Sequence, residues 1–174
     1  MRAALAVGVL LLMLGLRQSL EAQTVANPGF EGELRDWEAK FDYDMSRAEA
    51  EAARTGNWGL RVTDEDPSQG SGLRSLAIEA IPGRTYEVSF WARQVAGEGA
   101  LRVSLRFFDG SETQLQKKAP TVTVQEAAQW QPFVVKGKAP EEAVGFFVLI
   151  ESVPLETGTF DLDDFAAREI DSSE

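Results

Sequence analysis

Acidic residues draw attention to two short stretches of the sequence, one near each end of the chain. FDLDDF, residues 160–165, has three Asp within four positions, and NPGFE, residues 27–31, sets Glu31 beside an aromatic residue. Carboxylates so close together repel one another unless something neutralises them. Two interpretations stay open: an acidic strand end that faces water, or carboxylates that share a partner. Strict strand alternation over FDLDDF gives two faces, Phe160, Leu162 and Asp164 on one and Asp161, Asp163 and Phe165 on the other.

The residue types that are missing narrow the chemistry further. The sequence contains no His and no Cys, which excludes a Ser-His-Asp triad, a Cys-His pair and an imidazole metal site. Any bound metal ion would be held by oxygen atoms, which favours calcium or magnesium over zinc. Paired carboxylates could hydrolyse a glycosidic bond, but no acid outside residues 160–165 stands out in an apolar setting. We therefore expect that the protein is not an enzyme.

A second group of candidates comes from two alternating segments. In residues 86–93 one face is apolar, and the opposite face carries an outward Trp91 next to an Arg. Residues 101–108 alternate in the same way. If these strands are neighbours in one sheet, their outward side chains form a patch that suits a sugar, whose ring faces stack on an indole and whose hydroxyls need forked donors and acceptors. The candidate carbohydrate-binding residues are Trp91, Arg93, Arg102, Arg106 and Glu151. The alternative is that Trp91 packs under a loop and that the arginines pair with surplus acids.

Short strands must position these residues. Segments rich in β-forming residues recur at near-regular spacing without helical patterns between them, at 86–93, 101–107, 113–117, 121–124, 131–136, 144–151 and 159–168. Residues 46–54 are rich in helix formers, yet 48–51 alternate, and we expect a strand there. The series predicts an all-β sandwich of two antiparallel sheets.

The two ends of the chain are predicted to lie outside the folded domain. Residues 1–22 combine an early Arg2 with a short apolar run and a small residue, Ala22, which is typical of a cleaved signal peptide rather than an anchor helix. We expect a secreted, periplasmic or extracellular protein that does not stay in a membrane after cleavage. The polar residues 171–174 are expected to fray. A net charge of −11 argues against nucleic acid as a partner, because the chain would repel the phosphate backbone.

Several motifs, taken in order, resemble a carbohydrate-binding module of the family 4/9/22 type. They are NPGFE, Trp37, GNWGLRV at 56–62, IPGRTYEVSFWAR at 81–93, Trp130-Gln131 and FDLDDF. The resemblance runs from Asn27 to about Ile170, within a single domain predicted at residues 23–170, and implies a jelly-roll sandwich of the galactose-binding-domain-like class. It also implies a structural calcium ion between the first and last strands. Mapped onto this sequence, Glu31 and Asp163 would supply side-chain oxygens, with Asp164 as the substitute if the strand parity differs.

The function that the resemblance implies is non-catalytic binding of a polysaccharide or oligosaccharide on the concave sheet. Such modules usually accompany a catalytic partner, so a surface or enzyme assembly is an expected context. An adhesive or structural module without sugar specificity would have a similar sequence, because one fold serves several roles.

Overall fold

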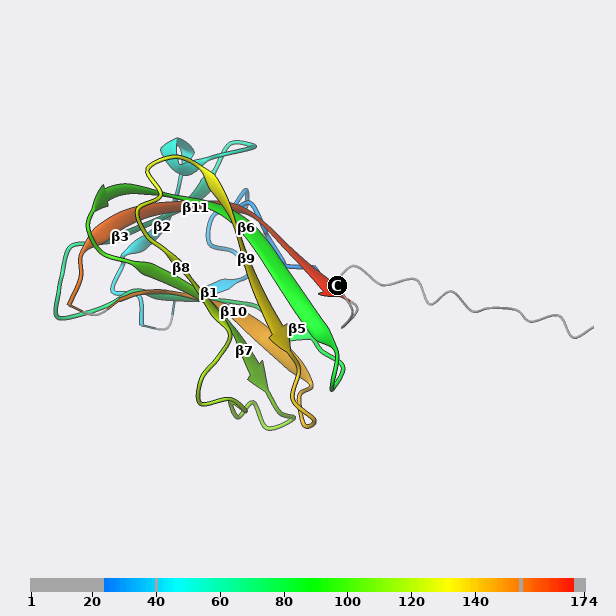
Figure 1. The fold of residues 1–174 in the computed structure, drawn as a ribbon. Coiled ribbons are helices and arrows are strands. Elements are labelled where there is room, and N and C mark those ends of the chain that lie inside the picture. The colour runs from blue at the N-terminus through cyan, green and yellow to red at the C-terminus, as the bar shows by residue number, and fades with distance from the viewer. Residues whose placement is uncertain (1–23, 40, 154, 171–174) are drawn as a thin grey trace, which may run out of the picture.

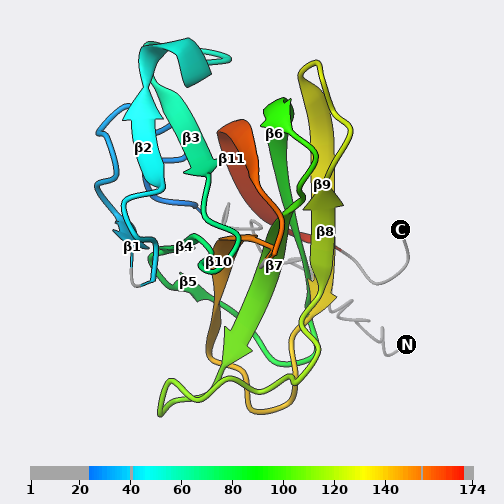
Figure 2. The same cartoon turned by 90° about the vertical axis from the view of Figure 1, so that its left-hand side faces the viewer.

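The computed structural model describes residues 24–39, 41–153 and 155–170. Its strands form two antiparallel sheets, which Figures 1 and 2 show as two layers. Sheet A has the order β1-β4-β10-β7-β8, with β5 also paired to β10. Its strands are β1 (Trp37–Ala39), β4 (Gly72–Ser75), β5 (Ile78–Glu79), β7 (Leu101–Phe108), β8 (Thr121–Val124) and β10 (Gly145–Ser152). Sheet B has the order β2-β3-β11-β6-β9, and its strands are β2 (Ser46–Glu49), β3 (Gly59–Asp64), β6 (Thr85–Gly97), β9 (Gln131–Lys138) and β11 (Gly158–Ile170).

The predicted all-β sandwich is therefore confirmed, with two local differences. Residues 46–54 divide into β2 and a short 3-10 helix, η1 (Ala50–Ala52). Residues 113–117 contribute one isolated bridge, Phe108 to Gln114, rather than a strand. Within the described ranges, the structure has no helix that is long and apolar enough to cross a membrane. The expected signal peptide, residues 1–22, and the expected frayed tail, residues 171–174, lie outside the described residues.

The core fills the space between the inner faces of the two sheets. The predicted inward set of β6 is confirmed, since Tyr86, Val88, Phe90 and Ala92 are all buried. Tyr86 of sheet B contacts two rings of sheet A, with centroid distances of 6.4 Å to Phe107 and 5.3 Å to Phe146. Its buried hydroxyl accepts a hydrogen bond from the backbone N–H of Ile81 at 2.7 Å. Contacts of this kind lock the two sheets together and fix the outward side chains that face solvent.

The first motif and the last strand meet at one place. The N–H of Phe165 donates to the carbonyl oxygen of Pro28 at 2.9 Å, and the Phe165 ring packs against Phe30 and Trp37 at centroid distances of 6.0 and 5.3 Å. Strict alternation, which put Phe165 on the same face as Asp163, was wrong. Asp164 takes a left-handed conformation (φ 55°), and the register between β11 and β6 shifts between Asp163 and Ala166. This β-bulge turns Phe165 into the core.

Candidate functional site

The five predicted carbohydrate-binding residues do not form one patch. β6, which carries Trp91 and Arg93, belongs to sheet B, whereas β7, which carries Arg102 and Arg106, belongs to sheet A. The chain passes from one sheet to the other after Gly97, which has φ 79°. Because both sheets turn their outward side chains away from the core, the two groups lie on opposite sides of the sandwich. The expected shared patch was therefore wrong.

On sheet B, Arg93 belongs to a row of charges that crosses the sheet. Register pairs Arg61 with Asp161, and Asp161 with Arg93. The fully buried Asp161 accepts hydrogen bonds from Arg61 Nε at 2.7 Å and from Arg93 Nε at 2.9 Å. The bond to Asp161 also raises the pKa of Arg61. The Arg93 guanidinium lies over the ring of Trp130, 4.9 Å from its centroid. All these groups satisfy one another, which indicates a structural role.

Trp91 is covered as well. The guanidinium carbon of Arg54, from the segment after η1, lies 3.6 Å from the centroid of the Trp91 ring. Arg54 is held there by an ion pair with Asp164 at 2.7 Å. This is the alternative that the sequence left open, in which Trp91 packs under a loop. One face of its indole is thus occupied by a cation rather than open to a sugar ring.

On sheet A, the outward residues of β7 and β10 form a polar fork. Glu151 is the direct register partner of Arg102, yet its carboxylate pairs diagonally with Arg106, with 2.9 Å between Arg106 Nη2 and Glu151 Oε2. Arg106 also donates through Nε to Ser104 Oγ at 3.1 Å. The Arg106 and Glu151 side chains keep 27% and 36% of their surface exposed. Donors and acceptors are therefore fixed in position but still reachable from solvent.

A hollow of about 570 Å³ lies beside this fork. It is lined by Arg102, Arg106, Gln116, Lys118, Ala119, Pro120, Thr121 and Glu151. Gln116 Oε1 is buried and has no hydrogen-bond partner among the described residues. A buried acceptor of this kind calls for a donor from water or from a ligand. Three of the five predicted residues, Arg102, Arg106 and Glu151, are thus brought together at one hollow. We take this face as the candidate site.

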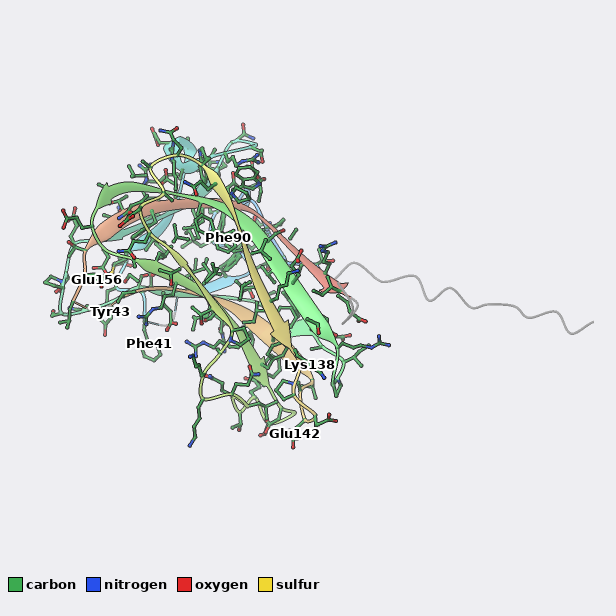
Figure 3. The ribbon with its side chains drawn as sticks, in the orientation of Figure 1. Phe41, Tyr43, Phe90, Lys138, Glu142 and Glu156 are labelled. Atoms are coloured by element: carbon green, nitrogen blue, oxygen red, sulfur yellow. The ribbon has the colours of Figure 1, made fainter. Side chains whose placement is uncertain are left out.

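An aromatic residue that the sequence analysis missed lies on the same face. Gly72 of β4 is the register partner of Glu151, and a Cβ built on Gly72 would lie 3.7 Å from the Cβ of Phe41. Phe41 therefore lies over the outer face of sheet A, next to Glu151, with 73% of its surface exposed. Figure 3 shows Phe41 and Tyr43 at one edge of the sandwich. Phe41 sits in a loop without periodicity, and the exposure that marks it in the structure cannot be read from the sequence.

A second aromatic residue on this face, Phe147, already packs against neighbouring side chains. The ring of Phe147 stacks on Phe108 at a centroid distance of 4.4 Å. The guanidinium carbon of Arg74 lies 4.1 Å from the centroid of Phe147, and Arg74 in turn pairs with Glu38. This stack fills the middle of the sheet, which leaves Phe41 as the more accessible ring.

The predicted calcium ligands hold a loop from two sides. Glu31 Oε1 accepts hydrogen bonds from the backbone N–H groups of Asn57 at 2.8 Å and Trp58 at 3.0 Å. These bonds lower the pKa of Glu31, and the bond from Trp58 has the largest effect. Asp163 Oδ2 accepts the N–H groups of Arg54 at 2.7 Å and Thr55 at 3.0 Å. Burial raises the pKa of Asp163 despite these bonds.

The distances around Gly29 show that the two carboxylates belong to one region. A Cβ built on Gly29 would lie 3.3 Å from Asp163 Oδ1 and 4.0 Å from Glu31 Cγ. Asp164, the substitute ligand, instead pairs with Arg54. In the described part of the chain, no three His, Cys, Asp or Glu side chains gather closely enough to hold a metal ion. Carboxylate and backbone oxygens are the donors that suit a hard cation, and calcium binding stays a prediction.

Comparisons with known proteins agree with this architecture. The family described as "Carbohydrate binding domain" matches residues 22–142. No match to a curated protein was found. Among solved structures, the C-terminal family 22 carbohydrate binding module of Clostridium thermocellum Xyn10B is 23% identical, with a TM-score of 0.59 and coverage of 82% of this chain and 90% of that one.

Two further structures show the same fold. The CBM22-1 xylan-binding domain of Paenibacillus barcinonensis Xyn10C is 19% identical, with a TM-score of 0.62 and coverage of 89% of this chain and 100% of that one. TmCBM61, solved in complex with β-1,4-galactotriose, is 19% identical, with a TM-score of 0.60 and coverage of 85% and 99%. The jelly-roll sandwich is thus shown by structure, and the family match covers most of the chain. The chain belongs to the carbohydrate-binding module family of the 4/9 type.

Proposed function

We propose that the protein binds carbohydrate without catalysis, on the outer face of sheet A. The observation that carries the proposal is the half-exposed Arg106–Glu151 pair, which lies between the hollow on one side and the exposed ring of Phe41 on the other. From Gly72, beside Phe41, across β10 to Arg102 is two interstrand spacings, about 10 Å. A short stretch of sugar chain could lie along this row.

The chemistry of these groups suits a sugar. Arg106 presents guanidinium donors and Glu151 carboxylate acceptors, so adjacent hydroxyls of one ring can bond both. Gln116 adds an acceptor that lacks a partner among the described residues. The Phe41 ring offers an apolar surface on which the C–H face of a sugar can stack. Because the sandwich holds these groups before a ligand arrives, little ordering entropy is lost on binding.

The acids around the hollow support binding rather than hydrolysis. Glycoside hydrolysis uses two carboxyl groups about 5–9 Å apart on either side of the scissile bond. Among the described residues that line the hollow, Glu151 is the one acid, and Arg106 neutralises it. The structural neighbours include a xylan-binding domain and structures in complex with xylohexaose and with β-1,4-galactotriose. Those β-linked glycans are the first to test.

The test is isothermal titration calorimetry of the purified protein against xylohexaose, β-1,4-galactotriose and a wider glycan panel. Glu151→Ala should weaken binding of any retained glycan by about tenfold, because hydrogen bonds to a charged group are lost. Glu49→Ala is the matched control: Glu49 pairs with Arg61 on the outer face of sheet B at 3.1 Å and is 33% exposed, against 36% for Glu151. Equal weakening by both variants, or no retention of any glycan, would contradict the proposal.

We further propose that a calcium ion joins the first and last strands, with Glu31 and Asp163 as side-chain ligands and neighbouring backbone carbonyls completing the set. The support is their shared position beside Gly29 and the all-oxygen chemistry of the region. Glu31 Oε2 and Asp163 Oδ1 each accept a single hydrogen bond, from Asn57 Nδ2 and from the N–H of Asp164, and so keep a second lone pair. The ion would stabilise the junction between the ends of the fold and play no part in recognising the sugar.

A further inference from the structure

The charges around the hollow differ from those of the chain as a whole. The chain carries 28 acidic and 17 basic residues, yet the hollow is lined by three cations, Arg102, Arg106 and Lys118, against one acid, Glu151. Most of the described arginines outside the hollow form ion pairs with Asp or Glu. They are Arg54, Arg61, Arg74, Arg84, Arg93 and Arg168. A local excess of positive charge in so acidic a protein needs an explanation from the site itself.

The excess of positive charge arises because Glu151 forms its ion pair with Arg106 and not with Arg102. Arg102 faces Glu151 directly across β7 and β10, but the carboxylate turns to Arg106, which Ser104 also orients. Arg102 and Lys118 are both exposed, and neither side chain forms an ion pair or a hydrogen bond with the described residues. Two uncompensated cations therefore border the same hollow, next to an acceptor and donor pair that is already satisfied.

Such an arrangement discriminates between kinds of sugar. Amide, carboxylate and hydroxyl side chains all form hydrogen bonds with sugar hydroxyls. Binding of a neutral glycan therefore does not require cations that lack a counter-ion. A carboxylate or sulfate group does, because Arg binds it through two parallel N–H···O bonds and Lys adds a point charge. The acidic remainder of the surface repels an anion only at short range, since salt screens charges beyond about 8 Å at physiological ionic strength.

We propose that the hollow on sheet A binds an acidic glycan, a sugar chain whose carboxylate or sulfate group lies between Arg102 and Lys118. This inference rests on the proposed sugar-binding function of the same face and names its ligand class. The hydroxyls of the charged ring then face Glu151 and Gln116, and the next ring extends across Gly72 towards Phe41. The two sources of the anion, a uronic acid and a sulfate ester, share this chemistry and are separated by experiment.

The experiment compares ligands that differ only in charge. Calorimetry is run with glucuronic-acid-substituted and unsubstituted xylo-oligosaccharides of equal length, with oligogalacturonides and their methyl esters, and with sulfated and desulfated galactan oligosaccharides. We expect the charged member of at least one pair to bind about tenfold more tightly at 50 mM salt. The preference should shrink at 500 mM salt, and the pair that shows it identifies a carboxylate or a sulfate as the anion.

Variants then locate the anion. Arg102→Ala and Lys118→Ala should each remove most of the preference, because each weakens binding of the charged ligand more than binding of its neutral partner. Arg47→Ala is the control, because Arg47 is an exposed arginine of sheet B that also has no ion pair among the described residues. Circular dichroism confirms that each variant is folded.

The outcomes that contradict the inference are distinct. Equal affinity for charged and neutral members would overturn the acidic ligand class and leave the proposed function standing. Failure of every glycan to bind would overturn both. Loss of the preference in Arg47→Ala, or equally tight binding of a single-stranded DNA oligomer, would show general attraction of polyanions rather than a built site.

Discussion

The carboxylate of Glu151 on β10 forms its ion pair with Arg106 at 2.9 Å, although Arg106 lies four residues along β7 from the direct register partner of Glu151. That register partner, Arg102, forms no ion pair with any residue that the structure describes. This choice has two consequences for the face of sheet A: it fixes one donor and acceptor pair in a reachable position, and it leaves a positive charge open to a ligand. The Glu151–Arg106 ion pair thus bears on both proposals, the binding of a sugar and the preference for an acidic one.

Phe41 should act as a stacking surface for the sugar. Replacing it in Phe41→Ala removes an exposed ring, so the free energy of unfolding should change little, while glycan affinity falls by about tenfold. Trp58→Ala is the control, because Trp58 is a partly exposed aromatic residue that lines a separate hollow with Arg47 and Ala48 of β2. Calorimetry on both variants checks the prediction, and comparable losses in the two would argue against Phe41.

Asp161 should be a determinant of stability and not of binding. Asp161→Asn removes the buried carboxylate charge that Arg61 and Arg93 share, and because both arginines stay partly exposed and Arg61 keeps Glu49, the cost should be about 2–3 kcal/mol. Urea unfolding should show a large fall in midpoint, whereas Glu49→Ala, at the exposed end of the same row, should cost no more than about 1 kcal/mol. A small effect of Asp161→Asn on unfolding would show that the row is not the structural element described above.

Calcium should raise the melting temperature. With a Kd of about 10⁻⁴–10⁻³ M, typical of extracellular modules, 10 mM calcium would stabilise the fold by about 1–3 kcal/mol. Glu31→Ala should lower the melting temperature even in EDTA, because the N–H groups of Asn57 and Trp58 lose their acceptor. What distinguishes a ligand is the calcium-dependent increment, which should vanish in this variant. Identical melting curves for the wild type in EDTA and in calcium would refute the ion.

Acid should weaken one outer-face cluster of sheet B. Hydrogen bonds from Arg168, and next from Lys136, lower the pKa of Glu87 below its usual 4.5. The unfolded chain therefore takes up this proton first as pH falls, so the stability that Glu87 contributes above pH 4.5 is lost as pH falls through its folded pKa. Glu87→Gln should be less stable than the wild type at pH 7, with a gap that narrows at pH 3. Urea titrations at both pH values measure it, and a gap that widens in acid would contradict the assignment.

The sequence predicts local features of this protein better than it predicts which strands meet. Alternation identifies the buried face of β6 correctly because burial follows strand period. It cannot show that β6 and β7 lie in different sheets, because the short connection after Gly97 looks the same whether it forms a hairpin or crosses the sandwich. For this reason the sequence predicts Trp91 and Arg102 on one face, whereas they lie on different sheets.

Two other features escape prediction for local reasons. The bulge at Asp164 depends on a left-handed residue that is not Gly, so period counting puts Phe165 on the wrong face. Phe41 depends on a close approach between its loop and Gly72, a tertiary contact that leaves no trace in composition or spacing. Arg102, Arg106 and Glu151 were found because they sit in regular strands whose outward faces can be counted.

The most direct test of the central claim is to map where a glycan binds. Two-dimensional ¹H–¹⁵N spectra of the protein, recorded while the tightest-binding oligosaccharide is titrated in, report which backbone amides change their surroundings. The account predicts that the largest shifts cluster in sheet A, at residues 102–106, 116–121 and 147–151, and in the loop around Phe41. Shifts concentrated instead on sheet B, around Trp91, Arg93 and Trp130, would contradict it.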